Sequence, residues 1–290
     1  MWFFYAISGA FFKSLAGYYR KVSTKVPASI FVWLNSLFYV ALLLPIVLLI
    51  QLPVVDFMTK HSILALGLAL TASGGLILNV KALSKDELSF VAPLNGLIPV
   101  MGLLGAWMFA DELPSYLGIL CVGLIFVGAY IMALTPNKVR WYDPILYLFK
   151  SSAARLSFGV AILYSLNTVL SKLSLNLGYD PITILFITDF ISILLLSYVL
   201  FTNKRKLIMP ALVSDWKTIL ASSISSLLGS ILHIFAVAGT YVSYALAIRR
   251  FDTIFSVVLG WKLLKESNIR NKLIGVCFIV LGSILLALIS

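Results

Sequence analysis

The sequence predicts an all-α integral membrane protein of ten transmembrane helices, arranged as two inverted repeats of five. Composition is the first reason: the 290 residues are 61% hydrophobic and 11% charged, with a mean hydropathy of +1.04. A soluble globular protein of this size needs far more polar surface. The other two reasons are the length of the apolar runs, which suits the membrane, and a repeat that relates the two halves of the chain.

The apolar runs are each roughly 18–23 residues long, enough to cross about 30 Å of hydrocarbon as a helix. They lie at 2–19, 29–50, 62–80, 89–109, 116–135, 156–176, 181–201, 217–238, 241–261 and 272–289. The first run begins at Trp2 and has neither a basic leader nor a small-residue cleavage signal. We therefore expect it to be a permanent helix and not a removable signal peptide.

The two halves superpose without a gap when the chain is shifted by 154 residues. Identical residues at this shift are Pro27 and Pro181, Gly75 and Gly229, Ala82 and Ala236, Ser89 and Ser243, Trp107 and Trp261, Glu112 and Glu266, Gly128 and Gly282, and Leu134 and Leu288. Glu and Trp are rare in this chain, so a matched pair of each indicates duplication. Because five spans is an odd number, the second half lies inverted relative to the first, which is typical of alternating-access transporters.

The expected domains follow from the repeat. Residues 1–135 form the first five-helix repeat, 136–155 a linker, and 156–290 the second repeat. The linker mixes basic and aromatic residues, so we expect a short amphipathic segment on the anionic cytoplasmic face of the membrane. A substrate site is expected near the midplane, where the two halves meet.

The ninth run carries Arg249, Arg250 and Asp252 in the middle of an apolar segment. An ionised group at a helix centre costs roughly 2.5–3.5 kcal/mol, so a functional site is the default expectation. Alternatively, Arg249 and Asp252 neutralise each other, since they lie three residues apart on one helical face. On a continuous helix the Arg249 face is small and polar, whereas Arg250 points about 100° away. Arg249 is therefore the stronger candidate for binding an anion.

A motif of Gly or Ala, Trp and then an acidic residue closes the fourth and ninth runs as Ala106, Trp107, Glu112 and as Gly260, Trp261, Glu266. With ten helices in two repeats and glycine-spaced closing helices, nearly the whole chain resembles the EamA-type drug/metabolite transporter superfamily. The resemblance implies a cavity lined mainly by helices 1, 3, 4, 6, 8 and 9, and cytoplasmic termini. Arg249 and Arg250 are also similar to the Lys-Arg pair with which the sugar-phosphate and nucleotide-sugar members hold phosphate.

Further candidates for substrate binding are polar residues inside the expected cavity helices: Lys13, Asn79, Asn95, Asn167, His233, Tyr241 and Tyr244. The 154-residue shift pairs Lys13 with Asn167, Asn79 with His233, and Asn95 with Arg249. Several have a structural alternative: Asn79 and Asn95 can hold neighbouring helices, Lys13 can extend to the membrane surface, and the tyrosines can be interfacial anchors. His233 can be a proton relay or a neutral imidazole bonded to serine.

Two carboxylates lie well inside the spans, Asp189 and Asp252. Either can carry a coupling proton or pair with Arg250. The seventh helix is peripheral in the family, so we expect Asp189 to be a structural ion-pair partner and Asp252 to lie nearer the substrate. Pro93 and Pro99 interrupt the fourth run around Asn95, at the segment equivalent to the arginines, and broken helices at matching places point to a transporter's binding site.

The net charge of +11 does not indicate nucleic-acid binding, because the basic residues gather on one side of the expected topology. Seventeen lie in or beside connections on that side, against Lys60 and Lys172 on the other. The positive-inside rule places the rich side in the cytoplasm. Both termini are then expected outside the cell, contrary to the family's usual arrangement, with the protein in the inner (plasma) membrane.

The sequence shows no phosphate loop, metal-ligand cluster or nucleophile-base pair, so we expect no enzyme activity, cofactor, metal or use of ATP. It predicts a secondary transporter that moves a small anionic or zwitterionic metabolite by alternating access, since the intramembrane cations outnumber the carboxylates. An exporter of amino acids or cationic drugs is one alternative, and a flippase or scramblase of an anionic lipid is another. A lipid-modifying enzyme is more remote. The coupling partner, a proton or a counter-substrate, and the state, monomer or homodimer, stay open.

Overall fold

The computed structural model describes residues 1–23, 26–86, 95–112, 114–133, 151–203, 205–265 and 272–289, and every regular element in these ranges is helical. The elements are α1 (Trp2–Val22), α2 (Ala28–Ile50), α3 (Val54–Lys60), α4 (Ser62–Leu83), the 3₁₀ turn η1 (Asn95–Leu97), α6 (Ile98–Phe109), α7 (Tyr116–Ala133), α9 (Ser152–Asn176), α10 (Pro181–Asn203), α11 (Arg205–Ala238), α12 (Val242–Ile248), α13 (Phe251–Leu264) and α14 (Lys272–Ile289). The all-α prediction is confirmed.

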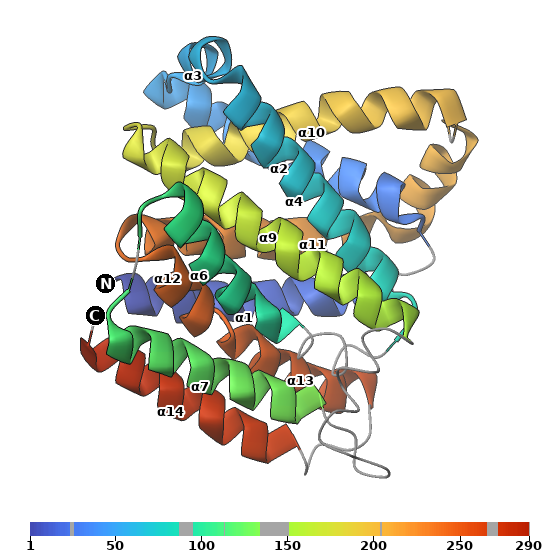
Figure 1. Cartoon of the computed structure of the whole chain (residues 1–290). Coiled ribbons are helices and arrows are strands. Elements are labelled where there is room, and N and C mark those ends of the chain that lie inside the picture. Colours follow the sequence, from blue (N-terminus) through green and yellow to red (C-terminus); the bar gives the residue numbers. More distant parts are fainter. Residues whose placement is uncertain are drawn as a thin grey trace.

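Five helices of the described ranges are long and apolar enough to cross a membrane, namely Ala28–Ile50, Ser62–Leu83, Ser152–Asn176, Pro181–Tyr198 and Val213–Ala238. Three shorter apolar helices, Ile98–Phe109, Tyr116–Gly128 and Ile274–Leu286, accompany them. Each of the ten predicted runs contains at least one helix, and the ninth contains two. The two termini lie at the same end of the bundle (Figure 1), as an even number of crossings requires.

The predicted linker, 136–155, falls mostly outside the described residues, and α9 begins at Ser152, inside it. The start of α9 is fixed locally, because the side chain of Ser151 accepts a hydrogen bond from the backbone N–H of Ala154 at 3.3 Å. This is the ordinary N-cap arrangement. The first helix of the second repeat therefore begins at Ser152, a few residues before the predicted boundary at 156.

Helix packing follows the internal repeat. The helix α1 packs along α11, and their equivalents α9 and α4 pack along each other in the same way. The contact of α1 with α13 likewise matches that of α9 with α6, and the pairs α2 with α10 and α7 with α14 each join equivalent helices. A twofold relation between the halves produces this pattern, as expected for inverted repeats.

The pair α7 and α14 shows the twofold relation at single residues. A Cβ atom on Gly128 would lie 2.6 Å from the carbonyl oxygen of Gly275, and one on Gly282 would lie 3.1 Å from the carbonyl oxygen of Cys121. Because residues 275 and 282 are the equivalents of 121 and 128, the same contact occurs twice. Small residues at such places let helix backbones approach closely in a membrane.

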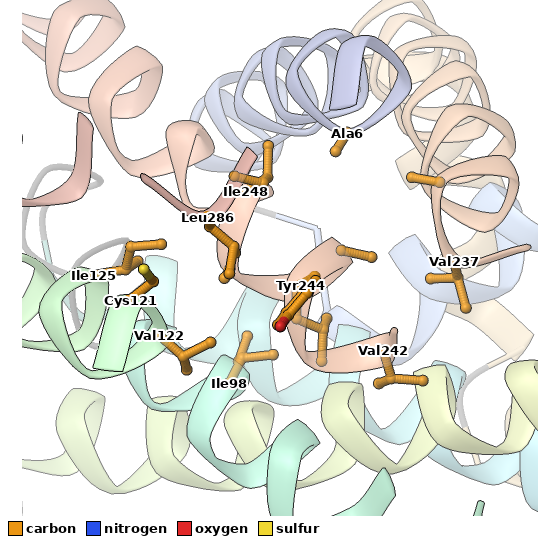
Figure 2. Close-up of a cluster of buried hydrophobic side chains, with 14 of the residues drawn as sticks. Ala6, Ile98, Cys121, Val122, Ile125, Val237, Val242, Tyr244, Ile248 and Leu286 are labelled. Carbon is orange, nitrogen blue, oxygen red and sulfur yellow. The ribbon is translucent and has the colours of Figure 1, made fainter. Parts of the chain in front are cut away.

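The largest hydrophobic cluster surrounds α12. All seven residues of α12 are buried, and Figure 2 shows Tyr244 among Ile98, Cys121 and Val122, which come from α6 and α7. A helix enclosed on every side must be apolar on nearly every side, and Val242–Ile248 meets this requirement except at Ser243. The position of α12 fixes where the next residue, Arg249, enters the molecule.

Candidate functional site

The ninth helix is broken at Arg249 and Arg250, where the sequence predicted one continuous helix over 241–261. At the break, the backbone N–H groups of Arg250, Asp252 and Thr253 donate to carbonyls three residues earlier, at 3.0 Å each. Such i to i+3 bonds are those of a 3₁₀ turn, which winds more tightly than an α-helix. The equivalent segment of the first half, η1, is also a 3₁₀ turn.

The break changes which arginine faces the site. On a continuous helix Arg250 would point about 100° away from Arg249, and on that basis the sequence favoured Arg249 alone. Both arginines instead line the central cavity. The helix-face argument was wrong, because it assumed a continuous α-helix and the helix is interrupted at these two residues.

The cavity has a volume of about 160 Å³ and lies between the two repeats. A water molecule needs roughly 10–15 Å³, so there is room for a small organic ligand. Its charged and polar lining comes from both halves and includes Lys13, Arg20, Asn35, Ser36, Tyr39, Asn79, Asn95, Tyr164, Asn167, Thr168, Asp189, Ser226, Ser230, His233, Arg249, Arg250, Asp252 and Ser256. The helices α2 and α10 also contribute, so Asp189 is not peripheral as the family resemblance implied.

Arg250 has two partners. Its guanidinium donates to the carbonyl oxygen of Asn95 at 3.0 Å and forms an ion pair with Asp252 at 3.3 Å. The side chain is 2% exposed. The carboxylate of Asp252 therefore pairs with Arg250, and the expected alternative pairing with Arg249 is not the one present.

Lys13 and Arg20 join α1 to α4 and α11 inside the cavity. The ammonium of Lys13 donates to the hydroxyls of Ser230 at 2.6 Å and Ser226 at 3.2 Å, so Lys13 does not extend to the membrane surface. Arg20 donates to the side-chain oxygen of Asn79 at 2.8 Å and to Ser226 at 3.4 Å. The sequence had counted Arg20 among the cytoplasmic connections. Arg20 follows Lys13 by seven residues, which places both side chains on one helical face, two turns apart. This spacing was the sequence signal that Arg20 faces the cavity.

Asp189 accepts a hydrogen bond from the hydroxyl of Ser36 at 2.7 Å. No ion pair involves Asp189 in the part of the chain that the structure describes, and Lys13 is the cation that acts on it electrostatically. The expected structural ion pair is therefore replaced by a hydrogen bond between α2 and α10. The carboxylate stays on the cavity wall.

Among the described residues, five cavity side chains have a buried polar atom without a hydrogen-bond partner, those of Arg20, Asn95, His233, Arg249 and Arg250. The side chains of Arg20 and Arg250 make other hydrogen bonds, whereas those of Arg249 and His233 make none. The Nε atom of Arg249 is buried and unpaired, and both ring nitrogens of His233 are buried and unpaired. Within the described ranges no acceptor bonds to the Arg249 guanidinium, whose charged neighbours are Asp252, Arg250 and Arg20. Buried polar groups are nearly always hydrogen-bonded, so these atoms are the strongest candidates for contacts with a ligand.

The remaining predicted residues divide between the cavity and the bundle. Asn167 lines the cavity but donates to the carbonyl oxygen of Leu68 at 3.0 Å and to Thr71 at 3.1 Å, tying α9 to α4. Tyr241 and Tyr244 do not line it. Tyr241 is 43% exposed, and Tyr244 packs in the cluster of Figure 2. Both tyrosines precede the break, so they face α6, α7 or the surface.

The acidic residue of the motif, Glu112, closes the end of the bundle that carries the termini. Its carboxylate forms an ion pair with Lys172 at 3.1 Å and accepts a hydrogen bond from the backbone N–H of Val242, the first residue of α12, at 2.8 Å. Lys172 also donates to the carbonyls of Val237 and Thr240. This group joins α9, α11 and α12 to the segment after α6. The matching acid, Glu266, lies outside the described residues.

A third polar cluster lies outside the spans, on α3. Asp56 accepts hydrogen bonds from Lys60 and from the Tyr179 hydroxyl, each at 2.7 Å. These bonds, that from Lys60 foremost, lower the pKa of the Asp56 carboxyl. The cluster anchors α3 to the connection before α10, and it is not part of the cavity.

The helical bundle, its apolar spans and its enclosed polar cavity define a multi-pass membrane transporter. Residues 151–288, the second half of the chain, match the EamA-like transporter family, and this match supports membership of the drug/metabolite transporter superfamily. A crystal structure of another protein superposes with a TM-score of 0.68, covering 98% of this chain and 97% of that one. The two sequences are 14% identical, so this likeness concerns the fold alone. None of the curated proteins matches the sequence.

Proposed function

We propose that the protein is a secondary transporter of a small organic anion and works by alternating access between its two repeats. The observation that carries the proposal is Arg249, a guanidinium that faces the cavity with no protein acceptor among the described residues. A charge buried without a partner is costly, so its place in the cavity is explained best by a ligand that supplies the missing charge.

The charge balance of the cavity supports an anion. Four cationic side chains line it against two carboxylates. Arg250 is paired with Asp252, and Lys13 acts on Asp189, which leaves Arg20 and Arg249 without a carboxylate of their own. A carboxylate or phosphate suits both, because a guanidinium binds either one through two parallel hydrogen bonds.

A zwitterionic metabolite is a second candidate, favoured by Asp189. Its carboxylate lies on the cavity wall with Ser36 as hydrogen-bond donor and can accept an ammonium group. A ligand with an anionic group at Arg249 and an ammonium at Asp189 would contact both repeats. An exporter of purely cationic compounds fits less well, since the cavity carries an excess of positive charge.

The first test is a stabilisation screen on the purified protein in detergent. A ligand at a hundred times its dissociation constant stabilises the folded state by roughly 2.7 kcal/mol. We expect water-soluble carboxylates or phosphates to raise the unfolding temperature. Stabilisation by cationic amines alone would support an exporter of cations, and stabilisation by lipids alone would support a flippase; either result would overturn the proposal.

The second test is uptake of the stabilising anion into proteoliposomes. We expect Arg249→Lys to reduce uptake strongly, because an ammonium cannot reproduce the two parallel bonds of a guanidinium. The matched control is Lys262→Gln, which removes one positive charge from the exposed surface of α13. Uptake that survives Arg249→Lys unchanged would remove Arg249 from the binding site.

A further inference from the structure

His233 is a cavity residue that no protein group satisfies. It lies on α11 and is 9% exposed, and neither Nδ1 nor Nε2 has a hydrogen-bond partner among the described residues. A neutral imidazole carries one donor and one acceptor, and a protonated one carries two donors. Both nitrogens are therefore available to a ligand in the cavity, in either protonation state.

The electrostatic surroundings of His233 are positive. The charged groups that act on it are Arg249 at the helix break, Lys13 on α1 and Arg250. Arg20 also lies on α1, and it bonds to Ser226 of α11. On the other helices that pack against α11, the titratable cavity residues are Tyr39 on α2, Tyr164 on α9 and Asp189 on α10. Protonation of His233 would add a positive charge beside these cations, and like charges oppose it.

We infer that His233 takes up a proton when the cavity binds its anion, so that the transporter carries proton and anion together. This inference rests on the proposed anion site at Arg249. An anion there offsets the repulsion between the cations and an imidazolium, and it can accept a hydrogen bond from the protonated ring. By linkage, the proton must strengthen anion binding by the factor by which the anion strengthens proton binding.

The sign of the pH dependence follows directly. The anion binds more tightly to the protonated form, so its affinity rises as the pH falls through the titration of His233. Asp189 would give the same sign if it were the titrating group. The two are separable by mutation, because Asp189 is bonded to Ser36 on a different helix.

The repeat provides a substitution that suits the fold. The equivalent of His233 in the first half is Asn79, so His233→Asn introduces the residue that the other repeat carries at this place. The ring has no hydrogen bond to lose among the described residues. We therefore expect the variant to fold, and its unfolding temperature checks this.

The first experiment measures sulfate binding to the full-length protein in detergent. Sulfate is a useful probe because it remains a dianion throughout the titration of a histidine, so its own charge does not change with pH. We expect its affinity for the parent protein to rise as the pH falls, by up to about tenfold for a shift of about one unit in the titration of His233. The rise should disappear in His233→Asn and persist in His61→Asn, the matched control at the chain's other histidine.

The second experiment observes the proton itself. In the His61→Asn variant a single histidine remains, so nitrogen NMR of labelled imidazole reports on His233 alone. Sulfate should move its titration to higher pH, and Arg249→Gln should abolish that movement. Sulfate that binds with the same affinity at high and low pH, or a pH dependence that survives in His233→Asn, overturns the inference but leaves the anion site intact. If sulfate and the anions of the screen fail to bind at all, the proposed function fails, and the inference fails with it.

Discussion

Arg249 and Arg250 are adjacent in the chain, yet they should have opposite effects on stability and function. Arg250 is 2% exposed and bonds to the Asn95 carbonyl and to Asp252. A hydrogen bond to a charged group contributes about 1.5–3 kcal/mol, and breaking a buried ion pair costs about 3–5 kcal/mol. We expect Arg250→Gln to lower the free energy of unfolding by about 3–5 kcal/mol, the cost of breaking the ion pair. At roughly 2–4 °C per kcal/mol, the unfolding temperature should fall by at least about 6 °C.

Arg249→Gln should behave differently, because its guanidinium has no bond to lose and lies near two other cations, Arg250 and Arg20. We expect the free energy of unfolding of the ligand-free protein to stay the same or rise by roughly 0.5–2 kcal/mol, the gain typical of a stabilising substitution. Anion binding should be lost. Thermal unfolding and sulfate binding, measured on both variants, check the pair.

The double variant Arg250→Gln with Asp252→Asn is the internal control. Both buried charges leave together, so most of the stability lost in Arg250→Gln should return. An Arg249→Gln protein as unstable as Arg250→Gln would refute the reasoning, since it would mean that Arg249 has a structural partner. Full anion affinity in Arg249→Gln would refute its role in binding.

Three further predictions concern the frame around the cavity. Glu112→Gln should lower the free energy of unfolding by up to about 3–5 kcal/mol, because the largely buried ammonium of Lys172 loses its carboxylate and keeps only its two carbonyl acceptors. Adding Lys172→Met should recover most of the loss in the same thermal assay. Gly128→Ala should lower the free energy of unfolding by roughly 1–3 kcal/mol, because it forces α7 away from α14. The control is Gly123→Ala, whose Cβ meets nothing within 4 Å and which should raise the free energy of unfolding by up to about 1 kcal/mol. Equal effects of the two substitutions would contradict the packing of α7 on α14. A reporter fused after Ser290 should behave as external, and a cytoplasmic signal would reverse the topology.

Much of the fold was predictable, because apolar run length and the 154-residue repeat are properties of the sequence itself. The broken ninth helix was not. No proline or glycine stands at Arg249 and Arg250 to announce it, unlike the prolines of the fourth run. The tight turn is set by packing, since α12 is enclosed by α6 and α7 before the break and α13 follows α1 after it. The sequence identified the right segment, but it could not show how the chain turns there.

The site was predictable in part, and its omissions have physical causes. Arg20 lies in the last turn of α1, where a basic residue normally faces the cytoplasm, and only its partners on α4 and α11 reveal that it points inward. Ser36 and Tyr39 were missed because α2 was not expected to reach the cavity. Tyr244 was included because its hydroxyl suggested a ligand, but the direction of a side chain on α12 depends on tertiary packing.

The symmetry of the fold and the asymmetry of its charge together suggest where the substrate binds. At three equivalent levels the repeats carry an ionisable side chain in one half and an amide in the other: Lys13 and Asn167, His233 and Asn79, Arg249 and Asn95. The three asparagines make structural contacts. Asn167 ties α9 to α4, Asn79 accepts a hydrogen bond from Arg20, and the Asn95 carbonyl accepts one from Arg250. The ionisable side chains line the cavity through α1, α11 and the α12–α13 break, three segments that contact one another. A ligand bound by them therefore sits to one side of the twofold axis, against this group of helices. The opposite group, α4, α9 and α6, is its structural counterpart, and in the proposed alternating-access mechanism the binding group moves against it.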